Sequence, residues 1–135
     1  MTKLAKPTIE GASLFLQLLS IMINDKDMDK ASKWVFEELD KKSYDDFKSK
    51  YPKGSDGYRN FQTFGGYMET LCTFVNRELI SEDLVFDLWG SLTWEKLGPI
   101  VHGMRKDIEM PRYLENYEVL AKRYSGWAER NPPKV

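Results

Sequence analysis

The sequence predicts an all-α fold, a single compact bundle of about six to seven helices with no sheet. Apolar residues recur every three or four positions in several long stretches, which is the spacing of one helix face. No stretch alternates apolar and polar residues for long enough to indicate a strand. The 135 residues include 41% hydrophobic types, enough to fill one core. We therefore expect one domain over residues 1–135.

Two helices are expected at the start of the chain. The first covers about residues 8–23, where Leu14, Leu18 and Met22 repeat every four positions. Its other sides are also apolar, so it needs cover on nearly all sides, as in a central helix or a dimer contact. The second covers about residues 27–39, with acidic residues at its beginning, where the helix dipole favours negative charge.

The middle of the chain combines a polar segment with the clearest helical pattern. A short helix is expected near residues 43–49, followed by a mobile polar loop over residues 50–57, which contains proline and glycine. A long helix is then expected over residues 58–79. Gly65 and Gly66 interrupt its apolar stripe, which indicates either a kink or the close approach of another backbone.

The last third contains a corner between helices and a final helix. Ser81 is a predicted N-cap of a helix over residues 82–89, and Gly90 suits the residue after its end. The next helix is expected to begin near Ser91 and to continue through Pro99, because the apolar spacing persists beyond it. Pro111 suits the first turn of the last helix, which two consecutive prolines end.

Composition excludes or disfavours several classes of function. With 20 Lys+Arg and 21 Asp+Glu the net charge is −1, which provides no basic surface for nucleic acid. The single cysteine, Cys72, cannot form an internal disulfide, and this favours a reducing compartment, here the cytoplasm. With one histidine, His102, a zinc site lacks ligands. A carboxylate-only Mg²⁺ or Ca²⁺ site remains open, although no EF-hand spacing is present, and no cofactor is predicted.

The apolar stretch from Leu14 to Ile23 has three interpretations. It is too short to span a membrane and lacks the features of a signal peptide. A core or interface role is favoured, and a homodimer is predicted. The predicted contact residues are Leu14, Phe15, Leu18, Leu19 and Met22. Attachment to a membrane surface is the remaining alternative.

Three charged residues lie in otherwise apolar helical segments: Glu69, Asp87 and Arg105. A carboxylate and an arginine on different helices can form a paired contact in a buried seam. The favoured interpretation is a structural ion network that fixes helix order, since a buried charge needs a partner. The alternative is the site of a small enzyme. A Cys72–His102 dyad is disfavoured because Cys72 belongs to an apolar stripe.

The order of motifs resembles a family of small bacterial and archaeal helical proteins catalogued only as a domain of unknown function. The stretches that carry the resemblance lie between about residues 30 and 127 and include ASKWVFEEL, GYMETLCTFVNRELISEDLVFDLWG, WEKLGPIVHGMR and PRYLENYEVLAKRYSGW. The positions that match the family pattern are Glu69, Leu71, Leu79, Leu84, Val85, Asp87, Gly90, Trp94, Leu97, Pro99, Arg105, Pro111, Glu118, Leu120, Arg123 and Trp127. The resemblance implies an all-helical fold and no particular activity. Some relatives carry a membrane-spanning N-terminus, and the shorter, more polar segment here departs from them.

The expected function is that of a non-catalytic cytoplasmic scaffold or regulatory module. It would bind another protein or itself, with no nucleic-acid partner, and binding to a membrane is disfavoured. The small enzyme and the membrane-surface protein remain the alternatives.

Overall fold

The structure is a computed structural model that describes residues 6–135, and within that range it consists of helices and the loops between them, without strands. The eight helical segments are α1 (Ile9–Asn24), α2 (Lys26–Glu37), α3 (Tyr44–Lys50), α4 (Asp56–Asn76), α5 (Glu82–Trp89), α6 (Trp94–Asp107), α7 (Glu115–Lys122) and α8 (Tyr124–Arg130). Only Arg123 separates α7 from α8, so the two can be counted as one interrupted helix and the bundle as seven helices. The predicted all-α bundle is confirmed.

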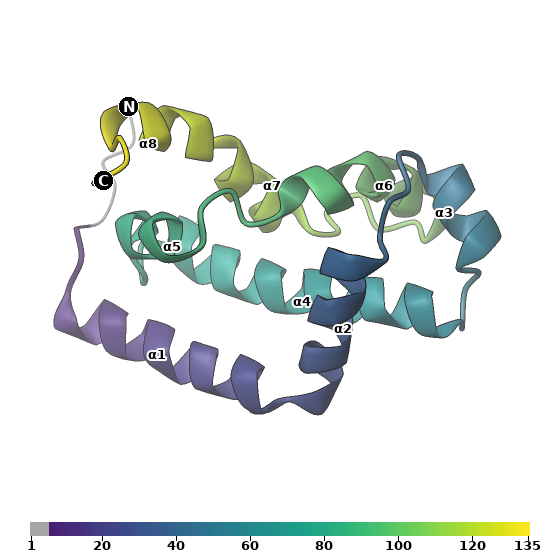
Figure 1. Ribbon diagram of the computed structural model, residues 1–135, viewed down its shortest axis with the longest axis horizontal. Coiled ribbons are helices and arrows are strands. Elements are labelled where there is room, and N and C mark those ends of the chain that lie inside the picture. The colour runs from purple at the N-terminus through teal and green to yellow at the C-terminus, as the bar shows by residue number, and fades with distance from the viewer. Residues whose placement is uncertain (1–5) are drawn as a thin grey trace.

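The long helix α4 occupies the middle of the bundle (Figure 1). It packs most extensively on α2 and α7, while α1 contacts it less. Its apolar stripe is fully buried at Phe61, Leu71 and Cys72, which places the core around this helix. Helix α1 therefore lies at one edge of the molecule and is held to the rest by a smaller area.

Side-chain N-caps explain where several helices begin. The side chains of Thr8, Ser43, Ser55 and Ser81 each accept a hydrogen bond from a backbone N–H in the first turn of the helix that follows. Such a bond satisfies one of the donors that a helix leaves unpaired at its start. The Ser81 cap and the Gly90 turn, with a φ of 67°, agree with the sequence prediction.

Two predicted helix starts are wrong. Helix α6 begins at Trp94 rather than near Ser91, because Leu92 and Thr93 both adopt positive φ values, of 64° and 63°. The phenol of Tyr117 donates a hydrogen bond to the carbonyl of Leu92 and fixes this corner. Helix α7 likewise begins at Glu115, because Leu114 has a φ of 57°.

Gly65 serves close packing, not a kink. Helix α4 is continuous through Gly65 and Gly66, and a Cβ atom at Gly65 would lie 2.9 Å from the Leu114 side chain. The group that lies close to Gly65 is therefore a side chain, whereas the sequence suggested another backbone. The loop before α4 has a defined position, since Lys53 lies 3.1 Å from the Asp107 carboxylate. The mobility of residues 50–57 stays a prediction.

Candidate functional site

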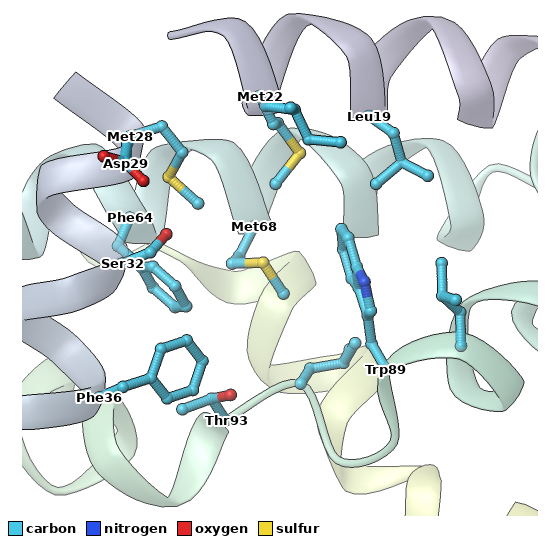
Figure 2. Close-up of a pocket in the computed structure, with 13 residues that line it drawn as sticks. Leu19, Met22, Met28, Asp29, Ser32, Phe36, Phe64, Met68, Trp89 and Thr93 are labelled. Atoms are coloured by element: carbon cyan, nitrogen blue, oxygen red, sulfur yellow. The ribbon is translucent and has the colours of Figure 1, made fainter. Parts of the chain in front are cut away.

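An apolar groove of about 660 Å³ lies between α1 and the rest of the bundle. Four elements line it: α1, α2, α4 and the corner between α5 and α6. Figure 2 shows their side chains converging on one space. The lining residues are Leu19, Met22, Ile23, Met28, Asp29, Ser32, Phe36, Phe64, Met68, Leu88, Trp89, Leu92 and Thr93. The volume and the mainly apolar lining are typical of a binding site.

Helix α1 contacts the bundle along its buried face, and its closest approach is near its start. Near the start of α1, Gly11 lies so close to the Leu79 carbonyl that a Cβ atom would be 2.9 Å from its oxygen. Farther along, Phe15 and Trp89 meet edge to face with ring centroids 5.7 Å apart. The groove lies beyond this contact, beside the C-terminal half of α1. The large Trp89 side chain and the shallow packing of α1 on α4 leave this space open.

The rim of the groove is unusually apolar for a surface. Ile23, Phe36 and Leu88 line the groove and are 75%, 57% and 58% exposed. Single exposed apolar residues are ordinary on protein surfaces, but a contiguous cluster around a hollow marks an interaction site. Three methionines, Met22, Met28 and Met68, add a flexible lining that can adapt to the shape of a partner.

Helix α1 has two apolar rows of side chains, here called seams. One seam packs on the core of this chain, and the other faces outward. The inner seam, Gly11, Phe15, Leu18 and Met22, is buried in the core of this chain. The outer seam consists of Ile9, Ala12, Leu16, Leu19 and Ile23, with the alternating three- and four-residue spacing of a helix–helix contact. Ile9 and Leu16 are 86% and 65% exposed. The outer seam thus leads into the groove at Leu19 and Ile23.

The residues predicted as a dimer contact divide between these surfaces. Phe15, Leu18 and Met22 belong to the inner seam and pack on this chain's own core, so they are not available to a partner. Leu14 and Leu19 are half-buried against that core. The predicted contact is therefore corrected: the residues of α1 that remain for a partner are those of the outer seam.

Glu69 is the first of the three predicted network residues. It caps a helix that lies far from it in the sequence. Its carboxylate accepts hydrogen bonds from the backbone N–H of Tyr117 at 2.8 Å and of Asn116 at 3.3 Å. These are N–H groups of the first turn of α7, whose own N-cap, Leu114, has no side-chain acceptor. Helix α4 therefore supplies the cap and the negative charge that the start of α7 requires.

A chain of polar side chains extends this contact along the interface of α4 with α5 and α7. The Asn76 amide donates to the backbone and side chain of Asn116, and Arg123 donates to Asn76 at 2.8 Å. Arg123 also pairs with Glu82 at 3.1 Å, and Glu82 is only 4% exposed. We call Glu69, Asn76, Glu82, Asn116 and Arg123 the polar seam. Its charged groups hold helices together.

Arg105 lies in a different contact, between α6 and α7. Its guanidinium donates to the Tyr113 carbonyl at 2.7 Å and to Glu118 at 2.9 Å. Burial alone would raise the pKa of Glu118, but hydrogen bonds from Lys122 and Arg105 outweigh it and leave the pKa below its ordinary value. An open surface hollow lies beside this pair and includes His102.

Asp87 is at the surface. Its side chain is 54% exposed and pairs with Lys134, near the end of the chain, at 2.6 Å. Glu69, Asp87 and Arg105 therefore do not form one network, because they do not pair with one another and each binds different residues. The predicted structural pairing fits Glu69 and Arg105, which both bind α7, whereas Asp87 binds neither of them.

The Cys72–His102 dyad is not formed either. Cys72 is fully buried in α4, and burial raises the pKa of its thiol above the ordinary value. The His102 side chain is 70% exposed and lies 3.7 Å from Glu118. A buried, protonated thiol far from solvent behaves as a small apolar group.

Sequence reasoning missed a surface cluster around Asp107. Its carboxylate accepts hydrogen bonds from the Tyr44 phenol and from Lys48, and Lys53 lies beside it. These three donors hold the pKa of Asp107 well below its usual range. The cluster ties α3 and the following loop to α6. No local sequence motif predicts this cluster, because Asp107 is about 60 positions from its partners.

Within residues 6–135, no three His, Cys, Asp or Glu side chains are grouped closely enough to hold a metal ion. Over the same range, no helix is both long enough and apolar enough to cross a membrane.

Taken together, the helices and the groove define an all-helical bundle with an apolar concave surface. The chain belongs to the family described as a domain of unknown function (DUF4760), whose model matches residues 7–124. The resemblance drawn from the motifs is therefore confirmed at the level of the family. No curated protein and no solved structure is similar enough to this chain to count as a match.

Proposed function

We propose that this protein is a non-catalytic helical interaction module. Its binding surface is the groove together with the outer seam of α1, and its ligand is a helix of another protein or of a second copy. The observation that carries the proposal is the exposed apolar rim of Ile23, Phe36 and Leu88 around a methionine-lined hollow. An amphipathic helix fits such a surface by placing its apolar face in the groove.

The polar groups of the molecule support a binding role over catalysis. The groove contains Asp29, Ser32 and Thr93, but the Asp29 carboxylate is exposed and pairs with Lys33 at 3.3 Å. Glu69 and Arg105 are occupied by contacts that hold α7 in place. The alternative of a small enzyme around Asp87, Glu69 and Arg105 requires these groups to converge on a substrate, and their separate partners argue against it.

The polar face of α1 argues against the alternative of a membrane-surface protein. Its exposed polar residues are Glu10, Ser13, Gln17, Ser20 and Asn24, none of which is basic. A helix that lies on a membrane usually has lysine or arginine on its polar face, where it meets anionic headgroups. The buried single cysteine, Cys72, favours the cytoplasm as the location, since it needs no oxidising compartment.

Site-specific photo-crosslinking inside the cell tests the proposal. A photoreactive phenylalanine analogue in place of Phe36 should give a discrete adduct with a protein chain, because this side chain is exposed at the groove rim. The same analogue at Glu129, an exposed position on α8, is the matched control. Adducts of equal yield at both positions, or none from Phe36, would contradict a binding role for the groove.

A flotation experiment with anionic vesicles separates the membrane alternative. The wild-type protein should stay in the unbound fraction. Vesicle binding that is abolished by Leu16→Glu would show that the outer seam faces lipid instead of a protein.

A further inference from the structure

The outer seam of α1 is chemically suited to meet a copy of itself. Between Gly11 and Asn24 the helix contains no Asp, Glu, Lys, Arg or His, so two such helices approach without repulsion between side-chain charges. The seam consists of branched aliphatic side chains with one small residue, Ala12, which permits close contact. Its three- and four-residue spacing is the pattern by which paired helices interlock.

The two ends of α1 indicate the direction of pairing. Glu10 lies in the first turn, and the residues just after the helix, Asp25, Lys26 and Asp27, carry both signs of charge. In an antiparallel pair centred on Leu16, Glu10 of one copy lies opposite Met22 of the other, so the two Glu10 carboxylates are at opposite ends of the contact. A parallel pair would instead bring like charges together. The helix dipoles also favour the antiparallel arrangement, since the positive end of one helix then adjoins the negative end of the other.

The groove provides a place for the end of the partner helix. In the antiparallel register, position 9 of one copy lies opposite position 23 of the other. Ile23 lines the groove, and Ile9 is the more exposed of the two at 86%. Ile9 of the second copy would therefore lie beside Ile23 at the mouth of the groove. The same contact is made twice, as twofold symmetry requires.

We propose that the occupant of this surface is a second copy of the chain. The two outer seams pair antiparallel, with Leu16 against Leu16 at the twofold axis and Ile9 of each copy at the groove of the other. The inference rests on the proposed function, because it names the partner of the same surface.

Cysteine substitutions test both the partner and the direction. The only native cysteine is buried, so a cysteine placed on the outer seam is the accessible thiol of the protein. Under mild oxidation of the purified chain, Leu16→Cys should form a disulfide-linked dimer. Ile9→Cys and Ile23→Cys should each remain uncrosslinked when alone and should link to each other when mixed. Glu129→Cys, at an exposed position of α8, measures how much disulfide-linked dimer forms by random collision.

A parallel arrangement has the opposite signature and would overturn the proposal: Ile9→Cys and Ile23→Cys would each crosslink alone. Yields from Leu16→Cys no higher than those from Glu129→Cys would overturn it as well. Such a result, together with a specific adduct from Phe36 to a different protein, would leave the proposed function standing and remove only the self-pairing.

A pair of charge substitutions provides a second readout that does not depend on oxidation. Leu16→Glu places a charge at the twofold axis and should weaken self-association by roughly 100-fold or more, since an unpaired charge in an apolar contact costs several kcal/mol. Gln17→Glu adds the same charge one position away, on the polar face of α1. This variant should have the same molar mass in solution as the wild type. Equal effects of both variants on mass would contradict the seam.

Discussion

The two sides of α4 differ in how the molecule uses its side chains. On the α7 side, Glu69, Asn76 and Arg123 make hydrogen bonds that join helices distant in sequence. On the α1 side the contact is apolar, contains an open groove and leaves Phe36 and Leu88 more than half exposed. The α7 side explains how the helices are held together. The α1 side contains apolar surface that does not contribute to holding the fold. We therefore propose that the polar seam fixes how α4, α5 and α7 are arranged and that the groove is the surface available for binding.

The largest effect on stability is expected from removing the charge that neutralises Glu82. Arg123→Ala leaves a carboxylate that is only 4% exposed without its ion-pair partner. Breaking a buried pair in this way costs about 3 kcal/mol, toward the low end of the usual range because the arginine side chain is itself 35% exposed. Chemical denaturation would measure the change. Arg130→Ala, at an exposed position of α8, should shift the free energy of unfolding by less than about 0.5 kcal/mol.

Removal of the cap on α7 should have the next largest effect. Glu69→Ala abolishes three hydrogen bonds to the start of α7 and is expected to cost about 2 kcal/mol. Glu69→Gln keeps an acceptor and should cost less. Thr70→Ala, at the exposed neighbouring position, is the control for changes in α4 itself. If Glu69→Ala were as stable as Thr70→Ala, the cap would not contribute to stability.

The Asp107 cluster gives a pH-dependent contribution. Because the folded-state pKa of Asp107 lies below the ordinary value of 3.8, its contribution is present above about pH 4 and is lost as the pH falls through the lower folded-state pKa. The stability difference between the wild type and Asp107→Asn should therefore narrow below pH 4. Denaturation midpoints measured between pH 2 and 7 would show this. A constant difference over that range would contradict the cause assigned to the shift.

The smallest effect is expected at Asp87. Its pair with Lys134 is exposed on both sides, and such pairs contribute about 0–1 kcal/mol. Asp87→Asn should change the melting temperature little at moderate ionic strength. A loss comparable to that of Arg123→Ala would mean that Asp87 has a structural partner beyond Lys134.

The sequence predicts most of the fold because its signals are local. Helical spacing and the caps at Thr8 and Ser81 specify helix type and several boundaries within a residue or two. The starts of α6 and α7 were missed because Leu92, Thr93 and Leu114 adopt positive φ values that their residue types do not indicate. Tertiary contacts, such as the Tyr117 hydrogen bond, impose that geometry.

The candidate binding surface was only partly predictable, for a related reason. The excess apolar character of α1 is visible in the sequence, but which residues face inward depends on how α1 packs against Trp89. Glu69 stands out as a charge in an apolar stripe, whereas its partners lie 47 and 48 positions later. The groove itself is lined by residues from several helices, so no single segment encodes it.

Amide hydrogen exchange at two protein concentrations most directly tests the difference between the polar seam and the surface formed by the groove and the outer seam. On dilution, we predict that protection falls in α1 and around Phe36 and Leu88, as the outer seams separate. Protection in α4 and α7 should stay the same, because the polar seam belongs to the single chain. Exchange in α1 that does not change with concentration, or a loss of protection that spreads equally through α4 and α7, would contradict this account.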